Sequence, residues 1–187
     1  TDADAGQTAT LAVSGHDSAS GLGAAVSVAA DGGFTYDGRN SPGVQALQQG
    51  ATANDTFSYT VRDEDGQTAT AQVTVTLAGV NDPPVALPDA VSANSVTPTT
   101  IAVLANDDDP DLPGGDVLSV VAVDTAGTRG LVTFTAAVVT FDPDGQFDDL
   151  TGNDTATTTF AYTIEDSAGA RSSATVTVTV AANQPPI

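Results

Sequence analysis

The chain has 187 residues and carries 24 acidic residues against only four arginines, which gives a formal net charge of −20. This charge excludes nucleic acid as a partner, because phosphate binding needs a basic face, and it argues against charge-driven adhesion to anionic lipid. The chain also lacks cysteine, so disulfides cannot stabilise it, and no apolar stretch is long enough to predict membrane insertion.

The most informative feature is an internal repeat. Residues 57–85, FSYTVRDEDGQTATAQVTVTLAGVNDPPV, recur as residues 160–187, FAYTIEDSAGARSSATVTVTVAANQPPI, with one residue deleted. The segments that begin at Thr1 and Asp108 also match. A period of about 100 residues indicates tandem whole domains rather than a solenoid of small repeats. We therefore expect two domains, over residues 1–80 and 81–187.

The first copy has the pattern of β-strands with one short helical possibility at 44–49. Its last strand alternates Val with Thr or Gln, which is typical of a strand with one dry and one wet face. The copy has nothing that corresponds to residues 83–107, about two strands. Either these strands lie upstream in the same chain, or a neighbouring subunit donates them by β-strand addition. The strands that we expect are near 8–14, 24–29, 33–37, 56–62 and 68–78.

The second copy supplies seven predicted strands and a second short helical possibility at 147–150. Seven short strands separated by frequent turn signals are the pattern of an immunoglobulin-like sandwich. The fold class is therefore all-β: two tandem immunoglobulin-like or cadherin-like sandwiches, the first lacking its N-terminal strands. Tyr59 and Tyr162 are equivalent and are expected to pack in the cores. The expected strands are near 85–92, 99–105, 117–124, 130–135, 137–142, 158–165 and 171–181.

The acidic residues are almost all aspartates, since only Glu64 and Glu165 are glutamates. Aspartate is favoured where a short carboxylate caps a turn or binds a hard cation within a loop. Adaptation to high salt is a second explanation for the bias. Sandwich topology brings the 106–111 loop, the 165–166 turn and the 80–84 linker to one end of the second domain. So many carboxylates at one end repel each other unless cations neutralise them.

The sequence therefore predicts Ca²⁺ at the joint between the two domains, because Ca²⁺ takes six to eight oxygen ligands with flexible geometry. For each aspartate taken alone, turn capping is the simpler role. Leu112 and Leu118 stand where an EF-hand loop needs Gly and Glu, so that motif is excluded. Asp37, Asn54 and Asp55 are candidates for further ligands from the first domain. The predicted ligands are Asn81, Asp82, Asn106, Asp107, Asp109, Asp111 and Asp166, and in the first copy Asp2, Asp4, Asp63 and Asp65.

Four features resemble the VCBS-type and cadherin-like tandem repeats of very large bacterial surface proteins, including RTX adhesins. They are A-N-D-D-D at 105–109, F-x-Y-T-V-x-D-x-D-G at 57–66, the alternating last strand, and G-x-N-D-x-P at 79–84. The resemblance covers nearly the whole chain. It implies an immunoglobulin-like fold, a calcium-stiffened extender role, type I secretion, and location outside the cell at the bacterial surface.

The leading function is thus a non-catalytic structural repeat of an adhesin or extracellular filament, whose partners are neighbouring repeats of the same polypeptide or of adjacent subunits. A carbohydrate- or protein-binding module and a strand-exchanging filament subunit are the alternatives. An enzyme is not expected, because His16 is the only histidine and no nucleophile motif is present.

Overall fold

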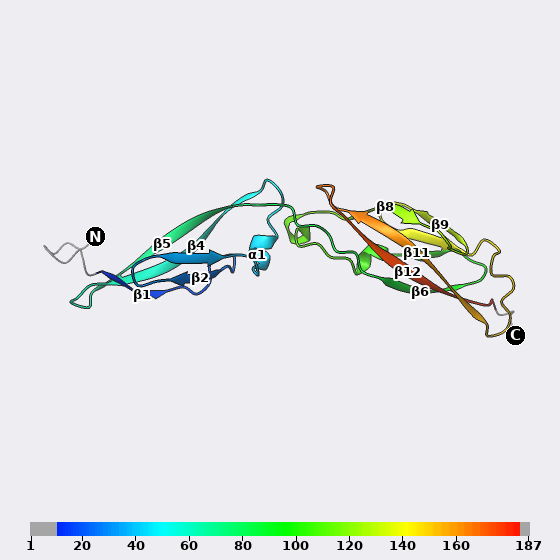
Figure 1. Ribbon diagram of the computed structural model, residues 1–187, viewed down its shortest axis with the longest axis horizontal. Helices are drawn as coiled ribbons and strands as arrows, with labels where there is room; N and C mark the ends of the chain where they lie inside the picture. The colour runs from blue at the N-terminus through cyan, green and yellow to red at the C-terminus, as the bar shows by residue number, and fades with distance from the viewer. Residues whose placement is uncertain (1–10, 184–187) are drawn as a thin grey trace. The chain divides into compact units, whose positions relative to one another are not determined.

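The computed structural model describes residues 11–183, which form two compact units, Thr1–Asp82 (unit 1) and Pro83–Ile187 (unit 2) (Figure 1). Each unit consists of two small β-sheets. The expected all-β fold of two tandem sandwiches is confirmed.

Unit 2 is a seven-stranded sandwich. Its larger sheet has the strand order β6-β12-β11-β8 and its smaller sheet the order β7-β10-β9. The pairs are antiparallel except that β6 runs parallel to β12 (Figure 1). The strands are β6 (Asp89–Asn94), β7 (Thr99–Ile101), β8 (Ser119–Asp124), β9 (Leu131–Phe134), β10 (Val139–Asp142), β11 (Thr155–Glu165) and β12 (Arg171–Ala181).

The alternating sequence of β12 explains where the core of unit 2 lies. Val176, Val178 and Val180 are each 0% exposed, while Thr175 and Thr179 between and beside them face solvent. Successive strand side chains point to opposite faces, so the valines fill the space between the sheets. Phe141 is also 0% exposed and faces this core from the other sheet.

Two local expectations for unit 2 are wrong. The predicted strand at 99–105 ends at Ile101, and a 3-10 helix, η1 (Val103–Ala105), follows it. The segment at 147–150 forms turns rather than a helix. Within these turns Phe147 belongs to the core: it is 0% exposed and packs edge-to-face against Phe141 with ring centroids 6.0 Å apart. A second 3-10 helix, η2 (Leu112–Gly114), was not expected.

Unit 1 has five strands within residues 11–82, fewer than unit 2. One sheet has the order β1-β4-β5 and the other pairs β2 with β3. The expected helix is present but begins earlier, because Ser41 caps its N-terminus and Pro42 occupies the first turn. The elements are β1 (Ala12–His16), β2 (Ala25–Val28), β3 (Phe34–Asp37), α1 (Pro42–Gln45), β4 (Thr52–Arg62) and β5 (Thr68–Ala78).

Tyr162 anchors the chain where it enters unit 2. Its buried hydroxyl lies 2.8 Å from the Leu87 carbonyl oxygen and 2.8 Å from Asp107 Oδ1. Burial and the neighbouring Asp107 carboxylate raise the pKa of this phenol, so it remains a donor. The expected role of Tyr162, core packing with a hydroxyl hydrogen bond, is what the structure shows.

Tyr162→Phe should destabilise unit 2 by about 1–3 kcal/mol, because it leaves buried acceptors without their donor. Amide hydrogen exchange in β11 and β12 measures this loss for unit 2 alone. Tyr59→Phe is the matched control, since Tyr59 occupies the same repeat position but is only half-buried. Equal losses in the two variants would contradict an anchoring role for the Tyr162 hydroxyl.

Candidate metal centre

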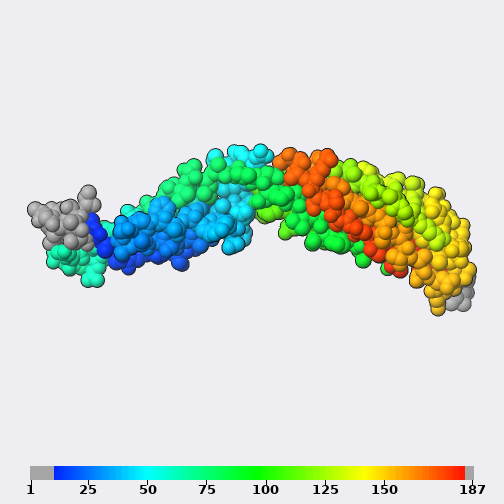
Figure 2. All heavy atoms as spheres, in the orientation of Figure 1, coloured from blue at the N-terminus to red at the C-terminus, as the bar shows by residue number. Residues whose placement is uncertain are grey.

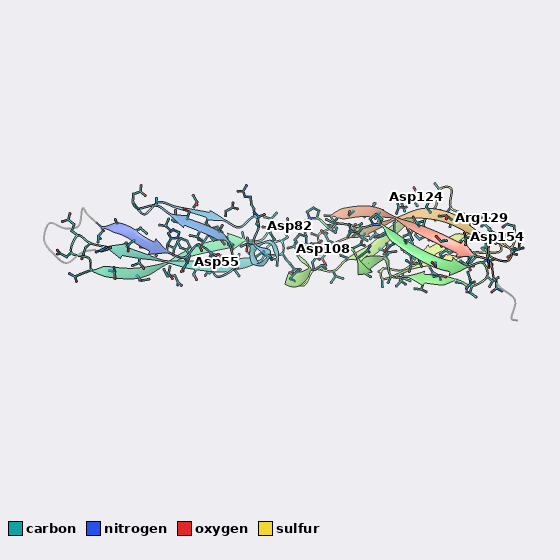
Figure 3. All side chains as sticks on the ribbon, turned by 90° about the horizontal axis from the view of Figure 1, so that it is seen from below. Asp55, Asp82, Asp108, Asp124, Arg129 and Asp154 are labelled. Atoms are coloured by element: carbon teal, nitrogen blue, oxygen red, sulfur yellow. The ribbon has the colours of Figure 1, made fainter. Side chains whose placement is uncertain are left out.

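The candidate site lies at the end of unit 2 where its chain begins. A two-residue bridge ties this start to the loop after η1: Val85 N–H donates to the Asp108 carbonyl (2.7 Å) and Asp108 N–H donates to the Val85 carbonyl (3.1 Å). Asp108 and Asp154 mark opposite ends of unit 2 (Figure 3). The turn between β11 and β12 is closed by the Asp166 N–H, which donates to the Ala170 carbonyl (3.1 Å).

Three buried carboxylates converge from this loop and this turn. Asp109 and Asp116 come from the loop between β7 and β8, and Asp166 comes from the β11–β12 turn. One carboxylate oxygen of each lies within 4.8 Å of the others. The three residues are 1%, 7% and 5% exposed, respectively, and Asp111 beside them is 0% exposed. Aspartates are almost never this buried without a partner of opposite charge.

Asp109 shows the clearest need for a cation. Its Oδ1 accepts a hydrogen bond from the Asp111 N–H at 2.8 Å, while its Oδ2 is buried without a hydrogen-bond partner. Burial raises the pKa of Asp109 against the effect of this bond, and the charges of Asp116, Asp111 and Asp166 raise it further. Folding has thus placed a carboxylate oxygen where neither water nor a donor reaches it, which is costly unless a cation binds there.

Asp116 is held ionised at the same site. Its Oδ1 accepts hydrogen bonds from Val117 N–H (2.7 Å) and Ser167 N–H (3.0 Å). Burial alone would raise the pKa of Asp116, but the hydrogen bonds from Ser167 and Val117 outweigh it and lower the pKa. Because Ser167 follows Asp166, this contact also fixes the loop against the turn.

Asp166 is oriented by its own turn. Its Oδ1 accepts hydrogen bonds from Ala168 N–H (2.9 Å) and Ala170 N–H (2.8 Å). The whole donor set is therefore oxygen, without imidazole or thiolate. Such a set suits a hard cation such as Ca²⁺, Mg²⁺ or Mn²⁺ better than it suits zinc.

Comparison with known proteins agrees with this picture. The family model of the bacterial cadherin-like domain matches residues 81–182, more than half of the chain. The chain belongs to the bacterial cadherin-like domain family. The model of the bacterial Ig domain matches residues 1–76. Both families consist of extracellular structural modules that are generally non-catalytic, and cadherin-like domains typically bind calcium.

The solved structures that the chain resembles are distant, each with a TM-score below 0.5. The chain is 12% identical to human mucin-like protocadherin EC1-2, with a TM-score of 0.46, covering 92% of this chain and 84% of that one. It is 17% identical to Drosophila N-cadherin EC1-4, with a TM-score of 0.47, and the match covers 94% of this chain and 42% of that one. It is 18% identical to mouse clustered PcdhgC3 EC1-3, with a TM-score of 0.40, and the match covers 94% of this chain and 56% of that one. No curated protein gives a significant match.

In the cadherin-like unit, the structure brings together Asp109, Asp111 and Asp166 from the predicted ligand set. Asp116 is an addition that the sequence reasoning missed. The predicted ligand loop ends at Asp111, whereas in the structure no strand begins until Ser119. The signal was therefore available, because Asp116 follows a Gly-Gly pair in the same loop and lies directly before the strand predicted near 117–124.

Asn106 and Asp107 have another role in this unit. The Asn106 side-chain amide donates to the Pro88 carbonyl (3.2 Å), and Asp107 Oδ1 accepts from the Leu87 N–H (2.8 Å). Together with the Tyr162 hydroxyl, they fix the segment that leads into β6. Neither belongs to the group formed by Asp109, Asp116 and Asp166.

The predicted ligands of unit 1 make local contacts. The Asn81 side chain donates to the Asp82 carbonyl (3.0 Å), and Asp82 Oδ2 accepts from Gln45 Nε2 (3.3 Å). Asp63 Oδ1 caps its turn by accepting from Gln67 N–H (2.7 Å), and Asp65 is exposed. Asp2 and Asp4 lie outside the described residues.

The further candidates in unit 1 are also engaged. Asp37 pairs with Arg39, and Asn54 Oδ1 accepts from the Thr76 hydroxyl (3.0 Å). Asp55 lies within unit 1 (Figure 3) and is 2% exposed.

Asp55 is a structural carboxylate rather than a metal ligand. It accepts hydrogen bonds from the Ser20 and Tyr36 hydroxyls and from the Leu22 and Thr56 N–H groups. Burial alone would raise its pKa, but these bonds outweigh burial and lower it. Its charge is therefore satisfied by the protein itself, in contrast to Asp109.

No helix within residues 11–183 is long and apolar enough to cross a membrane.

Proposed function

We propose that this chain is a non-catalytic extender segment of a secreted bacterial surface adhesin or extracellular filament, stiffened by Ca²⁺. The observation that carries the proposal is the buried, unpartnered Oδ2 of Asp109 among the carboxylates of Asp116 and Asp166. Asp109, Asp116 and Asp166 would hold the ion, which supplies the positive charge that the cluster lacks. The all-oxygen donor set and the family both support calcium.

The position of the cluster supports a stiffening role at the joint. It lies at the end of unit 2 that continues into the linker, because Val85 is bridged to Asp108 directly beside Asp109. The linker contains Pro83 and Pro84, which fix φ and favour an extended backbone. A cross-link between the loop and the turn would hold this end in one conformation. A series of such rigid units reaches farther than a flexible chain, whose span grows only as the square root of length.

The same reasoning supports the finer assignments. Neighbouring repeats are the proposed partners, and the resemblance to VCBS-type and RTX adhesin repeats supports type I export to the bacterial surface. A charge of −20 leaves the unfolded chain self-repelling. Calcium outside the cell would then complete folding after export.

Calcium titration by calorimetry, with small-angle scattering on the full chain, tests the proposal. We expect saturable binding and a change in maximum dimension on chelation. Asp166→Asn should weaken binding at least about tenfold, which corresponds to roughly 1.4 kcal/mol. Asp124→Asn is the matched control, because Asp124 is outside the cluster and only accepts from Ala126 N–H. The absence of binding heat, or equal losses in both variants, would reject the proposal.

A further inference from the structure

Unit 2 has four outer strands, and their edges differ in how well they are protected. The outer strands are β6 and β8 in the larger sheet and β7 and β9 in the smaller one. All the strands of unit 2 lie within residues 81–182, the stretch that the bacterial cadherin-like model matches. Exposed edges are normally protected against pairing with another chain by charge, proline, bulges or very short strands.

The edges of β6, β7 and β8 each carry such protection. β6 follows Pro88 and begins with Asp89. β7 follows Pro98 and has only three residues. β8 ends with Asp124, and a register shift interrupts its ladder with β11. Strand addition at these three edges is therefore disfavoured.

β9 carries none of these features. Leu131–Phe134 contains no charged residue and no proline, and its ladder with β10 runs without a register shift. Leu131 is 50% exposed and Phe134 is 42% exposed. The yellow-green atoms of the β9–β10 hairpin lie at the surface of unit 2 (Figure 2). β9 is therefore an exposed and apolar edge without protection.

The hairpin geometry determines which backbone groups of β9 point outward. Thr135 N–H donates to the Val138 carbonyl (2.9 Å) where β9 turns into β10. Hydrogen-bonded positions alternate along an antiparallel ladder, so Thr133 is the next residue of β9 that bonds to β10. The N–H and C=O groups of Val132 and Phe134 therefore point away from β10.

No second strand pairs with these outward groups in the described structure. β9 pairs with β10 alone. β8 reaches the hairpin beyond the end of β9, where Val120 N–H donates to the Ala136 carbonyl (2.9 Å). The outward side of Val132 and Phe134 is thus available to a strand from another molecule.

The edge is complementary to a second copy of itself. In a two-fold antiparallel pair centred on Thr133, Val132 lies opposite Phe134 of the second copy, and the outward N–H and C=O groups of the two residues meet. Val132 and Phe134 lie on one face of the sheet because they are two positions apart. The exposed Phe134 ring therefore gains an apolar neighbour, and both chains contribute the same residues, as a two-fold interface requires.

Charge favours this edge over other surfaces for contact between copies. Two chains that each carry a charge of −20 repel each other wherever their carboxylates meet. Residues 125–141 contain no acidic residue, and their single charge, Arg129, is paired with Asp149. Two copies can therefore approach at β9 without carboxylate repulsion. A cationic partner would be attracted to the acidic loops instead.

We propose that unit 2 associates with unit 2 of a second copy of the chain through β9, which joins the two smaller sheets into one continuous sheet. The interface is small, so it is weak for a single pair and gains strength where several repeats lie side by side. It deepens the proposed extender function, on which it rests only for its setting, by naming the contact between adjacent polypeptides. The contact itself needs no calcium.

Thr133→Cys tests the register, because the chain has no cysteine of its own. Thr133 would face its own copy at a position without backbone hydrogen bonds, where Cα atoms lie about 4.5 Å apart, within the range that a disulfide spans. We expect this variant to form a disulfide-linked dimer with diamide at least about tenfold faster than Thr100→Cys. Thr100 is the matched control, because it is exposed in the same row of the same sheet, where Thr140 pairs with both residues.

Sedimentation velocity of the natural chain, with a calcium chelator present, measures the association itself. We expect the average mass to rise with protein concentration and with ionic strength, because salt screens the repulsion between copies. Thr133→Lys should abolish this rise, since it places two like charges directly opposite each other. Thr100→Lys should leave the rise unchanged.

Three outcomes would overturn the proposal. They are a natural chain that stays monomeric up to about 1 mM, equal oxidation rates of the two cysteine variants, and association that requires calcium. The last result would assign the contact between copies to the acidic loops and would leave the extender function standing. Conversely, a lack of calcium binding would reject calcium stiffening without affecting the result at β9.

Discussion

Asp109→Asn should have opposite effects on unit 2 with and without calcium. Without calcium, the variant should be more stable than the natural chain by about 1–3 kcal/mol, because it removes a buried oxygen that has no partner. The asparagine amide can also donate to Asp116 or Asp166, which lie within the same cluster. With calcium present, the variant lacks one ligand for the ion, so calcium should add little to its stability.

The size of the calcium effect follows from binding linkage. A ligand present at 100 times its dissociation constant stabilises the folded state by about 2.7 kcal/mol. The natural chain should show this gain in unit 2, and the Asp109→Asn variant should not. Without calcium the variant should be the more stable of the two proteins, and with calcium the natural chain should be the more stable. Exchange of the β11 and β12 amides, with and without a chelator, measures both differences in unit 2 alone.

The same carboxylate predicts a pH dependence of the calcium-free chain. The pKa of Asp109 is raised above its ordinary value of 3.8, so its protonated form stabilises the folded state. This stability is fully present below pH 3.8 and is lost as the pH rises through the raised folded value. The advantage of Asp109→Asn should therefore appear as the pH rises through that window and persist at neutral pH. Asp116 contributes in the opposite direction because its pKa is lowered.

Asp148→Asn is the control for a general charge effect, because Asp148 is an exposed aspartate of unit 2 outside the cluster. It should show no inversion with calcium. If Asp109→Asn destabilises unit 2 equally with and without calcium, Asp109 is only a turn cap and its unpartnered oxygen has no bearing on cations.

The repeat and the strand pattern predict most of this fold because both depend on local sequence. Val176, Val178 and Val180 alternate with polar residues, and such alternation determines which face is buried. The lower burial of their equivalents in β5 could not be predicted from the same pattern, since it depends on which strands cover the sheet. Periodicity describes one strand, while burial is a property of its neighbours.

The candidate site also combines features that the local sequence predicts with features that depend on neighbouring elements. The density of aspartates in the 106–111 loop directs attention to this end of unit 2, where the group of Asp109, Asp116 and Asp166 lies. It does not distinguish Asp107, which anchors Leu87, from Asp109, which lies within the group that also contains Asp116 and Asp166. Asp116 is tied to the site by accepting a hydrogen bond from the Ser167 N–H of another turn, and such a contact leaves no periodic signal in the sequence.

Phe141→Ala should be among the most destabilising single changes in unit 2, with a loss of about 3–5 kcal/mol. Phe141 is 0% exposed on β10 and packs against the Phe147 ring at 6.0 Å. Gly130 lies directly against it: a Cβ at that position would be 2.6 Å from the Phe141 ring. Backbone this close to the ring leaves little room for other side chains, so the cavity should stay largely unfilled.

Hydrogen exchange of the β10, β11 and β12 amides measures this loss without interference from unit 1, because a chain of two units need not unfold in one step. Phe134→Ala is the matched control: Phe134 lies on the adjacent strand, opposite Val139, but is 42% exposed. Phe134→Ala should cost less than about 1.5 kcal/mol of stability, since a side chain that is already partly exposed has less apolar area to lose from burial. Similar losses for the two phenylalanines would mean that β10 does not face the main core, and the two-sheet arrangement of unit 2 would then have to be revised.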